Sequence, residues 1–113
     1  MRVLLVNPPF YRFLGSHYNA NSLGIAYIAS TLNNNGHDAW LYNADFVNET
    51  TYKKLKGLFE GFVDYKTYFK DEEHEIWHEV TNKILEFKPD WIGYTSYTAN
   101  ITTIDIISRK VKK

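Results

Sequence analysis

Apolar and polar positions along the chain fall into blocks that predict strands and helices in alternation. Residues 2–6 are apolar on both faces, which is typical of a central strand in a parallel sheet, and Asn7-Pro8-Pro9 ends the run because proline cannot donate to a ladder. Residues 22–34 predict a helix, whose apolar stripe comprises Ile25, Ile28, Ala29 and Leu32. Gly36 and a second short strand at residues 39–42 follow, which completes a β-α-β unit.

The second half of the chain repeats the pattern after a less regular segment. Residues 46–70 form an insertion rich in Phe and Tyr, for which we expect one or two short helices that act as a packing lid or an interface. Residues 71–87 predict a helix with Asp71 as N-cap and an apolar face of Ile76, Val80, Ile84 and Phe87. Residues 91–96 predict the third strand. Asn100 then caps a last helix, whose apolar residues are Ile101, Ile104, Ile107 and Val111.

These elements predict one α/β domain over residues 1–113, with a parallel sheet of three strands and helices on both faces. Doubly wound sheets usually carry about five or more strands. Three strands leave an apolar edge, so we expect the chain to be the front part of a longer protein. A homodimer through that edge is one hypothesis for how such a piece stays soluble.

Composition narrows the classes of function. The 113 residues include 13 basic and 13 acidic side chains, which argues against a general nucleic-acid binder and against an anionic-membrane binder. The chain has no cysteine, which excludes disulfides, thiolate metal sites and iron–sulfur ligation within it. The first apolar run is too short to span a bilayer and has no signal-peptide pattern, so we expect a cytoplasmic protein.

Candidate binding residues follow the predicted strands. In parallel sheets, ligands bind where the carboxyl ends of the strands meet. Asn7, Pro8, Pro9 and an aromatic loop that includes Tyr11 follow the first strand, and Asp45 follows the second. The third strand is followed by four residues with hydroxyl groups, beside the N-terminus of the last helix: Thr95, Ser96, Tyr97 and Thr98. Their position predicts contact with a ligand.

His74, Glu75 and His78 match the H-E-x-x-H pattern of zinc hydrolases. Helical spacing places both histidines opposite Ile76, so they face solvent if Ile76 faces the core. A third ligand at the usual spacing is also missing. We therefore interpret this pattern as a solvated helix face, and zinc chemistry as the weaker hypothesis.

Several segments resemble, in order, the N-terminal cobalamin-binding domain of B12-dependent radical SAM enzymes: residues 3–9, 22–32, 36–38, 43–45 and 89–96. The resemblance implies a flavodoxin-like, Rossmann-type domain that holds a corrinoid over the strand ends. It places Asn7, Pro8, Pro9 and the loop with Tyr11 near the corrin ring. Ser22, Leu23 and Gly24 would border the corrinoid, and residues 95–98 would line the groove for its nucleotide tail.

The resemblance further implies that cobalamin carries a methyl group, or serves ring-forming chemistry, in a larger enzyme. S-adenosylmethionine and a [4Fe-4S] cluster on three cysteines would belong to a downstream radical SAM barrel beyond Lys113, since this chain has no cysteine. Two family features are absent, namely the Asp-x-His-x-x-Gly motif of the lower axial histidine and a later Gly-Gly segment. The alternative is a degenerate flavodoxin-like interaction module that binds no cofactor.

Overall fold

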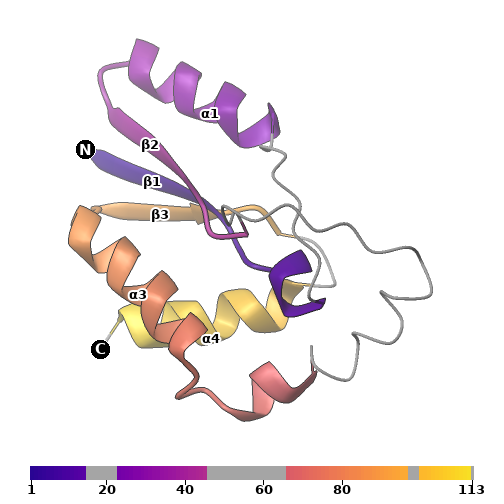
Figure 1. Ribbon diagram of the computed structural model, residues 1–113. Coiled ribbons are helices and arrows are strands. Elements are labelled where there is room, and N and C mark those ends of the chain that lie inside the picture. Colours follow the sequence, from indigo (N-terminus) through magenta and orange to yellow (C-terminus); the bar gives the residue numbers. More distant parts are fainter. Residues whose placement is uncertain (15–22, 46–65, 97–99, 113) are drawn as a thin grey trace.

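A computed structural model of the chain describes residues 1–14, 23–45, 66–96 and 100–112 (Figure 1). Its elements are β1 (Arg2–Asn7), a 3-10 helix η1 (Tyr11–Leu14), α1 (Leu23–Asn34), β2 (Asp38–Asn43), α3 (Glu75–Phe87), β3 (Trp91–Tyr94) and α4 (Ile101–Val111). The three strands form one parallel sheet in the order β2-β1-β3. The predicted α/β fold with a three-stranded parallel sheet is confirmed.

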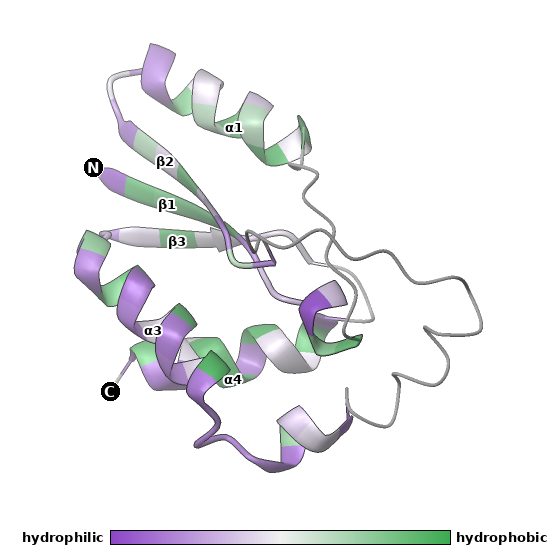
Figure 2. Ribbon diagram, viewed as in Figure 1, coloured by the Kyte–Doolittle hydropathy of each residue, from purple (hydrophilic) through white to green (hydrophobic). Residues whose placement is uncertain are grey.

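The register of the sheet decides which side chains face which helices. Arg2 lies opposite Asp38 in β2, and Val3 lies opposite Trp91 in β3. Because side chains alternate along a strand, Val3 and Leu5 point to one face and Leu4 and Val6 to the other. Helices cover both faces, α1 on one and α3 with α4 on the other, as the central, fully apolar β1 in Figure 2 requires.

Two hydrophobic cores of unequal size result. The larger core lies between the sheet and α3 with α4, and its buried residues are Leu4, Val6, Phe13, Leu14, Ala44, Trp77, Val80, Ile84, Ile106 and Ile107. The smaller core lies under α1 and consists of Leu5, Ile25, Ala29 and Ala39. Ile28 belongs to the predicted stripe of α1 but is 52% exposed, so that prediction is wrong at this position. A single helix on this face covers too little of the sheet to bury a wider stripe.

The start of α3 differs from the prediction. The helix begins at Glu75, and its N-cap is His74, whose Nδ1 accepts a hydrogen bond from the backbone N–H of Ile76 at 3.1 Å. Asp71 instead accepts a hydrogen bond from the N–H of Glu73 in the turn before the helix. The cap therefore lies three residues later than expected, because Asp71 closes a local turn of its own.

The buried face of α4 is also displaced. Its buried residues are Thr103, Ile106 and Ile107, whereas Ile101 is 56% exposed. Asn100 occupies the N-cap position, but its side chain donates to the carbonyl of Thr95 at 3.0 Å and makes no capping bond. The predicted cap is therefore wrong in its bonding, because the end of β3 competes for the same amide.

Residues 15–22, 46–65, 97–99 and 113 lie outside the described part of the chain, and with them most of the predicted insertion at 46–70. The described end of the insertion packs on the larger core. The Tyr68 and Trp77 rings flank Phe13 at centroid distances of 4.8 and 5.1 Å, and Trp77 donates to the carbonyl of Tyr68. Among the described residues, no helix has the length and apolar character needed to cross a membrane.

Candidate functional site at the strand ends

The carboxyl ends of the three strands lie on the same side of the molecule as η1 and the N-termini of α1 and α4 (Figure 1). We call the described residues that follow the strands the rim: Asn7, Pro8, Pro9, Asn43, Ala44, Asp45, Thr95 and Ser96. The parallel topology alone explains this convergence, since every strand must point the same way.

Asp45 is the centre of the hydrogen bonding on the rim. Its carboxylate is 5% exposed and accepts three backbone N–H groups, from Phe10 at 2.9 Å, Tyr11 at 3.2 Å and Arg12 at 3.0 Å. These amides belong to the start of η1, so Asp45 caps that short helix from a different strand end. The loop after β1 is thereby fixed to the end of β2.

A second set of bonds joins the same two strand ends. Asn7 donates from Nδ2 to Oδ1 of Asn43 at 2.9 Å, and its carbonyl accepts the N–H of Ala44 at 2.9 Å. Oδ1 of Asn43 also accepts the N–H of Asp45 at 3.2 Å. The predicted site residue Asn7 is therefore held in place, and one of its donor groups is already used within the chain.

Arg12 connects the rim to α3. Its guanidinium donates to the carbonyl of Ala44 and to the carboxylate of Glu79, both at 2.8 Å, and its side chain is only 10% exposed. Tyr42 lies near this pair. Burial raises the pKa of its phenol to about 12, the negative charge of Glu79 adds to the rise, and the charge of Arg12 opposes it.

The predicted residues of the first loop divide by burial. The side chains of Pro8 and Pro9 are almost completely buried, so they shape the loop and present no surface to a ligand. Tyr11 is half-buried, and its ring packs edge-on against Phe10 at 5.0 Å. At the start of α1, Leu23 is 66% exposed and Gly24 is exposed, whereas Ser22 lies outside the described residues.

The end of β3 presents the predicted hydroxyl groups. The N–H of Thr95 donates to the carbonyl of Val6 at 3.0 Å, which ties this end to β1. Its Oγ1 is buried and has no hydrogen-bond partner in the described part of the chain, while Ser96 is exposed. Tyr97 and Thr98 lie outside the described residues. An unpaired buried hydroxyl is costly, and a bound polar group is one way to satisfy it.

Sequence reasoning placed Asn7, Asp45 and Thr95 on one rim but missed how they are bonded. It also missed Asn43, Arg12 and Glu79 as parts of the network. A signal was present for Asn43 and Asp45, because Asn and Asp side chains directly after a strand often accept backbone amides of a neighbouring turn. No local pattern pointed to Arg12 and Glu79, which are far apart in the sequence.

The H-E-x-x-H residues do not form a metal site in the structure. Nδ1 of His74 is occupied by the N–H of Ile76, and Nε2 of the exposed His78 lies 3.3 Å from the Glu73 carboxylate. The described residues contain no group of three or more His, Asp or Glu side chains arranged to hold a metal ion. These contacts agree with a solvated helix face.

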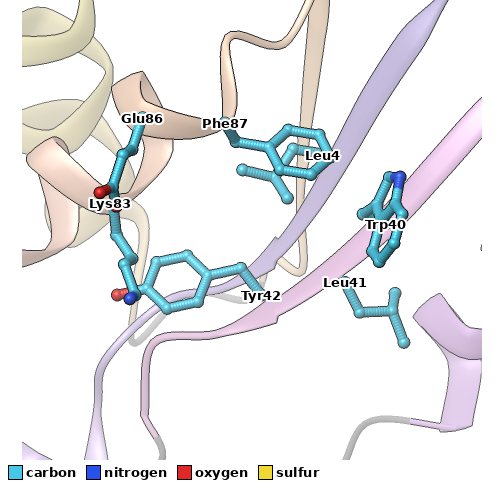
Figure 3. A pocket seen from close by; sticks show the side chains of 7 residues that line it. All are labelled: Leu4, Trp40, Leu41, Tyr42, Lys83, Glu86 and Phe87. Atoms are coloured by element: carbon cyan, nitrogen blue, oxygen red, sulfur yellow. The ribbon is translucent and has the colours of Figure 1, made fainter.

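Two open cavities lie away from the rim. One, of about 350 Å³, is bounded by β2 and the C-terminal half of α3, and Figure 3 shows Trp40, Tyr42 and Phe87 around it. The other, of about 390 Å³, lies between β3 and the C-terminal half of α4. The cavities and the polar rim are therefore separate features of the surface.

Comparisons of the chain with protein-family models, curated proteins and solved structures found no match.

Proposed function

We propose that this chain is the N-terminal part of a cobalamin-binding domain of a B12-dependent radical SAM enzyme. The observation that carries the proposal is the rim, where a parallel sheet brings polar groups from three strand ends and two helix N-termini to one edge. In open α/β sheets this edge is where ligands bind. The resemblance of residues 3–9, 22–32 and 89–96 to that family suggests the corrinoid as the ligand.

The described residues fit a bound corrinoid in part. The unpaired, buried Oγ1 of Thr95 and the exposed hydroxyl of Ser96 offer polar contacts beside the N-terminus of α4. Leu23 and Gly24 offer an exposed, largely apolar border at the start of α1. Pro8 and Pro9 support the corrinoid only indirectly, through the rigid shape they give to the first loop.

In the proposed function this chain binds and orients the cofactor and does not catalyse a reaction by itself. Bound cobalamin supplies methyl-carrier chemistry, or in some relatives of this class ring-forming chemistry. S-adenosylmethionine and the [4Fe-4S] cluster need a separate radical SAM barrel, because the chain has no cysteine to ligate iron. The barrel is thus a proposed partner of the domain.

One observation favours the second candidate function, a flavodoxin-like interaction module without a cofactor. The rim groups of β1 and β2 satisfy one another, since Asn7 bonds to Asn43 and Asp45 accepts three amides of the first loop. A crevice whose polar groups are bonded internally has fewer groups left for a ligand. In this alternative the domain contacts another protein.

A visible absorption titration of the chain with hydroxocobalamin and methylcobalamin tests the proposal. We expect a saturable spectral shift. The variant Ser96→Ala should weaken binding by about fivefold if its hydroxyl contacts the cofactor. Ser30→Ala is the matched control, because Ser30 is equally exposed but lies on α1 away from its N-terminus. Asn7→Ala should also weaken binding, and its unfolding curve separates lost contact from lost structure.

Absence of a spectral shift with either corrinoid would favour the interaction module. A shift that both serine variants retain equally would place the corrinoid somewhere other than the end of β3.

A further inference from the structure

The outer edge of β3 is open in the described part of the chain, where β3 pairs with β1 alone. The carbonyl of Val6 accepts the N–H of Thr95, so the odd-numbered residues of this stretch direct their backbone groups toward β1. Backbone groups alternate in direction along a strand. Ile92 and Tyr94 therefore direct their N–H and C=O groups outward, where no described strand meets them.

A groove accompanies this edge. The cavity of about 390 Å³ between β3 and α4 is lined by Trp91, Ile92, Tyr94, Ser108, Val111 and Lys112, among others. Its wall is mainly apolar, and α4 forms one side of it. On the opposite face of the same edge the Trp91 side chain is 61% exposed. The edge thus combines directional backbone groups with apolar surface on both faces of the sheet.

We propose that this groove is the docking site for an extended segment of another polypeptide, which joins the sheet as a fourth strand. Only extended backbone can satisfy the outward groups of Ile92 and Tyr94 together, which is how strand addition to a sheet edge gains affinity. Apolar side chains at alternate positions of the segment fill the groove under α4. This docking site is separate from the rim, so it does not depend on cobalamin binding.

The charge of the groove specifies the segment further. Lys112 lines the cavity, and its ammonium group makes no ion pair with a described residue, whereas Arg109 and Lys110 on the same helix pair with Glu72 and Glu73. A carboxylate on the docked segment complements Lys112. The partner is therefore a segment with alternating apolar residues and an acidic residue at one end.

A second copy of the chain fits the groove less well. Pairing of two β3 strands about a two-fold axis would bring both α4 helices over the junction, since each α4 lies along the outer side of its own β3. The two helices would compete for one space. A single extended segment carries no helix of this kind into the groove.

The test uses the whole chain and a short peptide of alternating valine and threonine that ends in glutamate. Amide hydrogen exchange, followed by NMR, should show slower exchange at Ile92 and Tyr94 as the peptide is added, with no change at Gly93, whose N–H already faces β1. A peptide of the same composition interrupted by proline is the matched control, because proline cannot supply the ladder donors.

Lys112→Glu should weaken binding of the acidic peptide by about two- to fivefold, as expected for an exposed ion pair. Lys83→Glu, an exposed lysine on α3 outside this groove, should leave it unchanged. Equal binding of the two peptides, or exchange at Ile92 and Tyr94 that neither peptide slows, would overturn the proposal. Protection that grows with protein concentration alone would show that a second copy occupies the edge instead.

Discussion

At the scale of single residues, Asp45 shows how one carboxylate can fix a loop that lies far away in sequence. It is buried and ion-paired to no described residue, and three backbone amides of the first loop provide its compensation. Hydrogen bonds from several amides stabilise a buried carboxylate without a cation. Its sequence position after a strand predicted a place on the rim, but its bonding partners lie more than thirty residues earlier.

We expect Asp45→Asn to lower the free energy of unfolding by about 1–3 kcal/mol. The amide keeps one acceptor oxygen but points N–H donors at a backbone N–H of the first loop. Chemical denaturation measures the change. Asp105→Asn is the control, because that exposed carboxylate bonds only on the surface, and an equal loss in both variants would contradict the role of Asp45.

Tyr42 gives a prediction for alkaline pH. Its pKa is raised from the ordinary value of 10 to about 12, mainly by burial. The folded state therefore holds the phenolic proton more tightly than the unfolded state does. The resulting stabilisation is fully present below pH 10 and is lost as the pH rises through about 12.

The unfolding free energy of the wild type, relative to Tyr42→Phe, should accordingly decline between pH 10 and about 12 and be constant below that window. Taking the difference from the phenylalanine variant cancels other groups that titrate in this range, including Tyr94, whose pKa burial also raises. A difference that does not vary with pH would show that the Tyr42 phenol is not buried as the structure has it.

At the scale of elements, helical periodicity located three helices but did not fix their ends or their buried faces. Val80 and Ile84 of α3 are buried as predicted, while Trp77, one position beside the expected stripe, is completely buried. A stripe predicted from spacing has a width of several residues, and the contacts with α4, Phe13 and Phe69 select which part of it is covered.

The N-terminus of α3 provides a test at this scale. His74→Ala should lower the free energy of unfolding by about 1 kcal/mol, because the Ile76 amide loses its acceptor. His74→Asn should recover most of that loss, since asparagine is a favoured N-cap. His78→Ala removes the other histidine of the same pattern, which is exposed and caps nothing, and denaturation curves of the three variants provide the comparison. If His78→Ala were the more damaging change, the capping assignment would be incorrect.

At the scale of the whole molecule, the sheet separates two cores of different size. The core under α3 and α4 includes side chains from six elements or loops, whereas the core under α1 has four buried residues. The cost of truncating a core residue depends on how many neighbours it loses and how far the site can collapse. The two faces should therefore respond differently to the same substitution.

Ile84→Ala should cost about 3–5 kcal/mol, and Ile25→Ala about 2 kcal/mol. Ile84 is completely buried in the larger core, and Ile25 is 9% exposed in the smaller one. Equilibrium unfolding of both variants measures the difference. Equal costs would mean that α1 is as firmly packed as α3.

The sequence by itself determined the alternation of strands and helices, the parallel three-stranded sheet and the edge where the polar residues gather. These features follow from local periodicity, from the residues that end each element and from chain connectivity, all of which are written in neighbouring positions. Tertiary structure alone decided that Asp45 caps the first loop, that Arg12 reaches Glu79, and that α4 buries Thr103 and Ile106 while Ile101 stays exposed. Those contacts join residues distant in sequence, and their partners are fixed only when the helices have packed on the sheet.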